Sequence, residues 1–274
     1  DDMTVGGTLG VTGVLTGTSL DISGDIDVDG TTNLDVVDID GAVDMASTLQ
    51  VDGAITFSST LNGLDILADA TNFVDSILIS QNASTGTLDS ASSNTGLGDT
   101  VFSALTSGDF NTAVGFKALE DHTTGASNTA IGAQALMNNT TAANNVAVGI
   151  SALKTNTTGA SNVAIGKNAL DANTTADNNT AVGADALGAN TTGTDNVAVG
   201  SGAADANTTG SNNTFIGDNS GGANTTASFN TAVGADSLLV NTTGAANTSL
   251  GQNALGANTT ANDNTAVGAD ALSA

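Results

Sequence analysis

Residues 179–195 read Asn-Thr-Ala-Val-Gly-Ala-Asp-Ala-Leu-Gly-Ala-Asn-Thr-Thr-Gly-Thr-Asp, and this 17-residue unit recurs without insertion or deletion in eleven copies that begin at Asn94. An extra residue in one stacked coil would displace every later coil, so a period this strict predicts a solenoid. The Asn that opens each copy lies at Asn94, Asn111, Asn128, Asn145, Asn162, Asn179, Asn196, Asn213, Asn230, Asn247 and Asn264. The Gly four residues later, predicted to be a turn residue, lies at Gly98, Gly115, Gly132, Gly149, Gly166, Gly183, Gly200, Gly217, Gly234, Gly251 and Gly268.

The composition of the unit indicates the type of solenoid. Seventeen residues are too few for two helices and a turn, whereas Thr, Val, Ile, Asn and Gly suit strands and tight turns. We therefore expect an all-β fold in which each unit is one coil of a parallel β-solenoid. Strands stacked about 4.8 Å apart would make the eleven coils a rod about 50 Å long.

The alternation within a unit predicts which side chains point inward. Thr180 and Val182 are two residues apart, so they share a face of the strand and are predicted to point into the coil. Ala181 points the other way, and this place is held by Ala in most copies, alongside a column of Leu that includes Leu187. We expect the Ala and Leu columns to form a second apolar surface, at which three parallel chains meet as a homotrimer around a common axis.

Two successive copies break this pattern. Ala204 and then Gly221 stand where Leu is expected, and Phe215 replaces the small Ala in the second of these copies. Loss of a packed Leu to Ala typically costs about 2–5 kcal/mol. We therefore predict that the ring of Phe215 fills the volume left by Ala204 and Gly221 at the trimer seam. The alternative is a surface Phe that marks a local binding spot.

Two phrases of the repeat carry a resemblance to known proteins. Asn-Thr-Ala-Ile-Gly-x-x-Ala-Leu (residues 128–136) resembles the head repeats of YadA-like trimeric autotransporter adhesins, which form a left-handed parallel β-roll. Asn-Thr-Thr-Gly (residues 156–159) resembles repeats of phage tail fibres and large bacterial surface proteins. The resemblance covers residues 94–274 and implies a left-handed β-roll, a homotrimer, a location outside the cell or on a virion, and a tip that binds a receptor or a cell-surface glycan.

The chain before the repeats has two parts. Residues 1–63 follow a looser rhythm of Leu-x-Val-x-Gly, as in residues 49–53, which predicts short strands with turns in a separate β-prism or β-helix shaft segment. Residues 64–93 are predicted to be a transition that caps the solenoid. The most apolar run of the chain, residues 73–79, is expected to close the end of the stack, and residues 82–93 are expected to form a loop.

Composition and charge exclude several classes of function. The 274 residues include no Pro, Cys, Trp or Tyr, so disulfides and thiolate metal sites are absent. The formal net charge is −25, with Lys117, Lys154 and Lys167 as the three cations, which argues against binding to nucleic acid phosphates and to anionic membranes. No run of 18 apolar residues predicts a membrane span. The opening Asp-Asp-Met predicts no signal peptide, which leaves a mature protein or a fragment as the two interpretations.

A cluster of carboxylates lies in the first segment. Asp25, Asp27 and Asp29 alternate with Ile26 and Val28, so they would line one face of a strand. One interpretation is a Ca²⁺ site, because carboxylate oxygens suit this ion. The other is a solvated face that keeps the fibre soluble, and we favour it because the glycine-bracketed ligand loop of calcium-binding repeats is missing. No other cofactor is predicted.

The sequence predicts that the chain is not an enzyme. His122 is the single histidine, so a Ser-His-Asp triad would have to use it. It stands where later copies have Asn, as at Asn139, and is therefore interpreted as a substituted turn residue. A carbohydrate depolymerase built on a β-helix would need paired carboxylates in a cleft, and the sequence offers no such pair, no P-loop and no zinc-ligand spacing.

The second Asn of each unit opens an Asn-Thr-Thr turn that also matches the acceptor sequence for N-glycosylation. These residues are Asn139, Asn156, Asn173, Asn190, Asn207, Asn224, Asn241 and Asn258. Glycans could not all fit at a spacing of about 4.8 Å. We expect instead that both Asn columns form ladders, in which each amide bonds to the next coil. The adjacent pair Thr174 and Thr175 would point to opposite faces, which argues against a flat ice-binding Thr array.

Together these patterns predict a structural fibre protein, similar to a phage tail fibre. Its rigid trimeric rod would space or present a tip that binds a host or another surface. The alternative is a bacterial surface adhesin or a self-assembling extracellular filament, and an ice-binding β-solenoid is less favoured. Neither nucleic acid nor membrane insertion is expected.

Overall fold

The computed structural model describes residues 65–70, 73–80 and 86–274, and within them every regular element is a β-strand. The shaft segment predicted for residues 1–63, together with Asp25, Asp27 and Asp29, lies outside the described residues. Among the residues that are described, no helix is long and apolar enough to cross a membrane.

The stack of coils begins at a longer pair of strands. β1 (Asp65–Ala70) pairs with β2 (Phe73–Ser80) antiparallel, and β2 pairs in parallel with β3 (Ala91–Ser92) and β4 (Thr95–Leu97). The apolar run 73–79 therefore does lie against the first coil, but as one strand of a hairpin and not as a coil.

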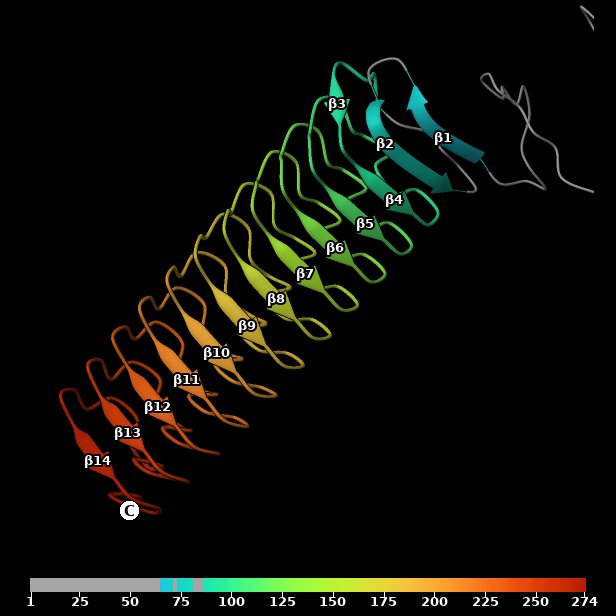
Figure 1. Ribbon diagram of the computed structural model, residues 1–274. Coiled ribbons are helices and arrows are strands. Elements are labelled where there is room, and N and C mark those ends of the chain that lie inside the picture. The colour runs from blue at the N-terminus through green and yellow to red at the C-terminus, as the bar shows by residue number, and fades with distance from the viewer. Residues whose placement is uncertain (1–64, 71–72, 81–85) are drawn as a thin grey trace, which may run out of the picture. The chain divides into compact units, whose positions relative to one another are not determined.

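Ten further coils follow, each with one three-residue strand (Figure 1). The strands are β5 (Thr112–Val114), β6 (Thr129–Ile131), β7 (Val146–Val148), β8 (Val163–Ile165), β9 (Thr180–Val182), β10 (Val197–Val199), β11 (Thr214–Ile216), β12 (Thr231–Val233), β13 (Thr248–Leu250) and β14 (Thr265–Val267). Each pairs in parallel with the next at equal places in the repeat, for example Val182 with Val199. The parallel β-solenoid with 17-residue coils is thus confirmed.

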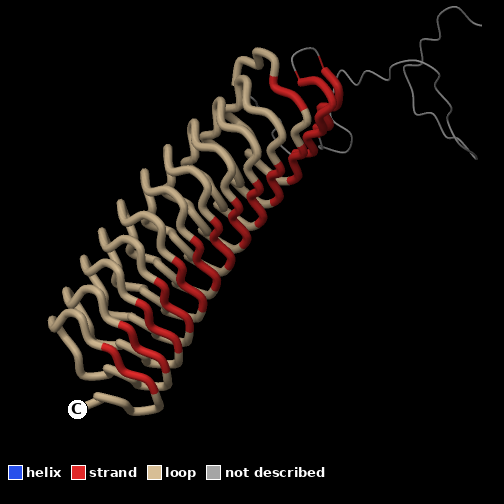
Figure 2. Tube along the Cα trace, turned by 60° about the vertical axis from the view of Figure 1, so that its left-hand side comes forward, coloured by secondary structure: helices blue, strands red, loops and turns tan. Residues whose placement is uncertain are grey.

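The strands form one line along one side of the stack, and turns make up the rest of each coil (Figure 2). The turns are also bonded from coil to coil: Leu187 N donates to Ala203 O at 2.9 Å, and Thr191 N donates to Thr208 O at 2.9 Å. We number the places in a coil from 1 to 17, starting at its first Asn. The ladder that holds the rod therefore runs along several sides of the coil, although only places 2 to 4 are strand.

Left-handed backbone at four places bends the chain into a closed coil. In the coil of residues 179–195, Gly183 has φ of 140°, and a Cβ there would collide with the carbonyl of Gly200 in the next coil, so place 5 requires glycine. Asp185, Leu187 and Asp195 have φ of 59°, 51° and 58° although each carries a side chain. The predicted turn role of the repeated Gly is confirmed.

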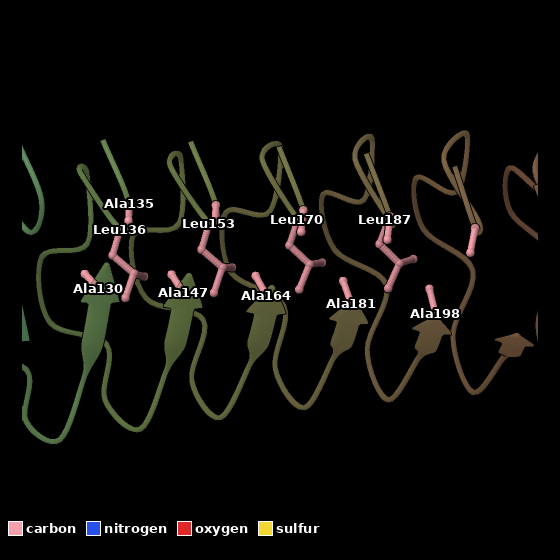
Figure 3. Close-up of a cluster of buried hydrophobic side chains, with 14 of the residues drawn as sticks. Ala130, Ala135, Leu136, Ala147, Leu153, Ala164, Leu170, Ala181, Leu187 and Ala198 are labelled. Carbon is pink, nitrogen blue, oxygen red and sulfur yellow. The ribbon is translucent and has the colours of Figure 1, made fainter. Parts of the chain in front are cut away.

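The predicted direction of the strand side chains was wrong. Ala181 is completely buried inside the coil with Leu187 (Figure 3). Ala186 is completely buried as well, whereas Thr180 and Val182 lie on the outside and are only partly buried. The interior is narrow, since Leu187 and the two Asn columns occupy it. It therefore accepts a methyl group from the strand but not a β-branched side chain. The Ala and Leu columns form the core of a single chain and are not a seam between chains.

Phe215 lies against Gly221, one of the two residues it was predicted to compensate for, but inside its own chain and not at a seam between chains. Phe215 is completely buried, and a Cβ on Gly221 would collide with its ring. The ring lies inside its own coil, next to the coil that holds Ala204. The first coil shows the reverse exchange: Gly96 takes the Ala place, and a Cβ on it would lie 3.1 Å from Cδ2 of Phe102, which takes the Leu place. The core therefore keeps its volume while large and small residues change places.

Candidate interaction surface

The outward side chains of β4 to β14 form two parallel columns, which we call the strand face. The place 2 column consists of Thr95, Thr112, Thr129, Val146, Val163, Thr180, Val197, Thr214, Thr231, Thr248 and Thr265. The place 4 column consists of Leu97, Val114, Ile131, Val148, Ile165, Val182, Val199, Ile216, Val233, Leu250 and Val267. All of these side chains are uncharged, and most of them are β-branched.

The strand face is apolar and open to solvent in the single chain. Ile165, Ile216 and Leu250 keep 40%, 38% and 47% of their surface exposed, although neighbours above and below shield them. Eleven strands at about 4.8 Å, with a width of about 10 Å, give a strip of roughly 500 Å². The largest apolar patch of a monomeric protein is usually about 300–600 Å² and is often functional, so this strip is a candidate binding surface.

Charged side chains lie on the turns and not on the strand face. Burial raises the pKa of Asp171, against the opposing effect of Lys154, and burial together with Asp185 raises the pKa of Asp205. Elsewhere Lys117 Nζ pairs with Glu120 Oε1 at 3.0 Å. Within the described ranges, no group of three or more His, Cys, Asp or Glu side chains could hold a metal ion.

Both predicted Asn ladders are present inside the coils. In the place 1 ladder, Asn196 N and Nδ2 donate to Oδ1 of Asn179 at 3.0 and 3.1 Å. In the place 12 ladder, Asn207 Nδ2 donates to Oδ1 of Asn190 at 3.0 Å. The carbonyl of Gly210 accepts from Asn196 at 2.8 Å and from Asn207 at 3.0 Å, so one carbonyl joins the two ladders in this coil.

These hydrogen bonds also bear on whether the Asn-Thr-Thr turns can be N-glycosylated. Asn190 is completely buried and its amide nitrogen is used in two hydrogen bonds, so the folded coil does not present it to a glycosylating enzyme. Thr174 and Thr175 differ as predicted: Thr174 Oγ1 donates to Thr191 O at 3.3 Å, whereas Thr175 is exposed.

His122 occupies place 12 of its coil, and the place 12 ladder begins at this residue because the preceding coil has Leu105 at place 12. The ring is completely buried. Its Nε2 lies 2.8 Å from Gly125 O, and its Nδ1 lies 3.1 Å from Nδ2 of Asn139. These partners are a carbonyl and an amide, whereas a catalytic triad requires a hydroxyl and a carboxylate. Sequence reasoning placed His122 correctly in the Asn column but made no prediction of its burial.

The site that the structure favours is therefore the strand face, which the alternation of the sequence assigned to the interior. Its residues were visible in the sequence, but the direction in which they point was not. Comparison with protein-family models, with curated proteins and with solved structures gave no match to this chain.

Proposed function

We propose that this chain forms the rod of a structural fibre, in which three parallel copies associate through their strand faces. The rod spaces or presents a tip that binds a host or another surface. The observation that carries this proposal is the strand face itself, an uncharged apolar strip that runs along all eleven coils.

The straight, regularly repeating shape of the strand face favours another copy as its occupant. Each chain has a net charge of −25, so two copies repel each other except where an uncharged surface is large enough to outweigh that repulsion. A partner must also be straight and repeat about every 4.8 Å to cover the whole strip. A second solenoid of the same sequence has both properties.

The resemblance of the repeat to trimeric fibres favours three copies. Three strips would bury roughly 1,500 Å² in all, shared among three contacts of roughly 500 Å² each, whereas two strips would bury roughly 1,000 Å² in one contact. At about 25 cal/mol/Å², three strips contribute on the order of 37 kcal/mol before the cost of association is subtracted. The seam thus differs from the one predicted from the Ala and Leu columns, while the trimer is retained.

The likeness of the repeat phrases to tail-fibre and adhesin repeats supports the biological setting. We propose a location outside the cell or on a virion, with a phage tail fibre as the first choice and a bacterial surface adhesin or filament as the alternative. The uniform coils serve to span a distance, and we assign them no catalytic step, cofactor or nucleic acid partner.

The test compares two variants that add the same charge to the same coil. Val182→Asp places a carboxylate on the strand face, and Thr192→Asp places one on the exposed turn. Native mass spectrometry should give a trimer of the 26.4 kDa chain for the unaltered protein and for Thr192→Asp, and a monomer for Val182→Asp. Both variants should keep the same far-ultraviolet circular dichroism, because both side chains point away from the core. A monomeric unaltered protein, or a trimeric Val182→Asp, would reject the seam.

A second candidate ligand for the strand face is ice. The place 2 column is Thr in eight of its eleven coils, so methyl and hydroxyl groups recur at a regular spacing on the outside of the coils. Should the chain prove monomeric, adsorption of the unaltered protein to a growing ice hemisphere, lost in Val182→Asp, would support this function instead.

A further inference from the structure

We propose that exposed phenylalanines at the edges of the strand face fix the register of the trimer, so that the same coil of each copy lies at the same height. This inference rests on the proposed trimer and adds which coils meet. The strand face alone sets the register weakly, because a copy that slips by one coil still has ten of its eleven strands opposite a partner strand. Its side chains are uncharged and similar in size, so the register must be set by residues that do not repeat.

Large apolar residues that do not repeat lie at the two edges of the strand face, at places 17 and 6. Phe110 lies two residues before β5 and is 63% exposed, and Phe116 lies two residues after β5 and is 47% exposed. Phe229 occupies place 17 of a later coil and is 65% exposed. The other coils have Ser, Asn, Asp or Ala at place 17.

The backbone makes Phe an unfavourable choice at place 17. Phe110 and Phe229 have φ of 57° and 64°, and bulky side chains are uncommon in this left-handed region. Most of each side chain also stays in contact with solvent in the single chain. Strained backbone that carries an exposed aromatic ring is typical of a residue kept for contact with another molecule.

Threefold symmetry brings opposite edges of the strand face together. When three strand faces surround a common axis, the place 17 edge of each copy lies beside the place 6 edge of the next, because a cyclic contact joins two different surfaces. Phe116 comes six residues after Phe110, which is about a third of a coil, or about 1.7 Å along the rod. Copies aligned without slip therefore place Phe110 of one copy against Phe116 of the next. By the same count, Phe229 meets Ala235.

A slip by one coil in the first direction brings both phenylalanines against carboxylates. Phe110 would meet Asp99, which is one coil before Phe116, and Phe229 would meet Asp218, which is one coil before Ala235. A carboxylate at such a contact loses water without gaining a partner, and the face of an aromatic ring is itself negative. This register is therefore disfavoured at both edges.

A slip in the other direction also loses the apolar contacts. Phe110 would meet Ala133, a much smaller side chain than Phe116, and Phe229 would meet the exposed polar Gln252. Ile150 is also exposed at place 6, but it meets Asn or Ser at place 17 in all three registers. It therefore does not distinguish between registers and provides a control.

The test uses engineered cysteines, since the chain has none. Ser161→Cys combined with Lys167→Cys places two thiols at places 17 and 6, with the same six-residue separation as Phe110 and Phe116. Ser161→Cys combined with Ala184→Cys is the matched pair for a slip by one coil. All three positions are exposed in the single chain. After mild oxidation with oxidised glutathione, non-reducing gel electrophoresis measures the covalent dimers and trimers.

In the chain with all phenylalanines present, the aligned pair should cross-link and the slipped pair should not. Adding Phe110→Ala and Phe229→Ala should raise the yield of the slipped pair by about tenfold or more, because each trimer contains three copies of each contact. Native mass spectrometry should still give a trimer, since the strand face is unchanged. Ile150→Ala should leave both yields as they were.

Two results separate this inference from the trimer itself. A trimeric chain that cross-links equally through both pairs, or that keeps only the aligned cross-link after Phe110→Ala and Phe229→Ala, would overturn the inference and leave the trimer intact. A monomeric chain with all phenylalanines present would overturn the inference together with the proposed function.

Discussion

Ala246 is one of the residues that hold a left-handed backbone without being glycine. Its φ is 56°, and it occupies place 17, which has positive φ in the other coils as well. Three earlier coils have Asn there, namely Asn144, Asn178 and Asn212. Asn tolerates this conformation better than Ala, because its short polar side chain can bond to the local backbone.

Replacing Ala246 by Asn should therefore stabilise the rod, by about 0.5–1 kcal/mol. The same exchange at Ala184, which is exposed and has no positive φ, is the control and should give no gain. Urea unfolding of the two variants measures the difference. Equal midpoints would show that the left-handed backbone at place 17 has no cost for Ala.

The packing around Phe215 predicts that a substitution at Gly221 compensates for a substitution at Phe215. Phe215→Ala should cost about 3–5 kcal/mol, because Gly221 and Ala204 leave its volume empty. Gly221→Leu alone should also destabilise, since the new side chain collides with the ring. The two changes together recreate the Ala and Leu arrangement of other coils and should be less harmful than either alone.

A double-mutant cycle from urea unfolding measures this coupling. Adding Ala204→Leu to the pair should recover more stability, because it fills the remaining gap in the Leu column. Additive losses in the pair would mean that Phe215 and Gly221 do not share one cavity.

At the level of elements, the repeat period was sufficient to predict the solenoid, because the 17-residue spacing fixes how each coil lies on the next. The side of the strand that points inward could not be predicted in the same way. Two sets of side chains were candidates for the interior, one with Thr180 and Val182 and the other with Ala181 and Leu187. Both sets look largely apolar, and the usual rule places the larger strand side chains inside. The width of the interior decides between them, and this width depends on turns whose left-handed backbone at Leu187 and Asp185 is not encoded by glycine.

The same reasoning explains what was found at the strand face. The sequence showed its residues and the resemblance implied a trimer, but the seam was assigned to the wrong columns. Phe215 was matched correctly with Gly221, because that prediction depended on conserved volume and not on direction.

Insertions test the stacking of the elements. One residue added after Val182, where β9 ends, should shift the left-handed turn residues Gly183 and Asp185 out of line with the coils above and below and break the hydrogen bonds between those turns. A whole 17-residue unit added at the same point should only lengthen the rod. Thermal unfolding followed by circular dichroism should show a clear loss for the first variant and none for the second. Similar melting of both would contradict stacking in register.

For the whole molecule, continuous hydrogen bonding predicts slow opening and resistance to proteases. The described coils contain Lys117, Lys154 and Lys167, and the first of these pairs with Glu120. Trypsin needs an extended, mobile segment, and the backbone at these residues is bonded between coils, as in Lys117 N to Asp99 O at 3.0 Å. Native digestion should therefore leave residues 94–274 intact for hours, while digestion in urea should not. Rapid native cleavage after Lys154 would contradict a rigid rod.

The common length of the coils has a consequence for the evolution of the gene. Because every unit has the same length and joins its neighbours in the same way, recombination between two copies of the coding repeat deletes or adds whole coils and leaves every junction intact. The length of the rod can thus change only by whole coils, in steps of about 4.8 Å. A lineage can therefore evolve a longer or shorter rod by gaining or losing whole repeats, without any substitution within a coil.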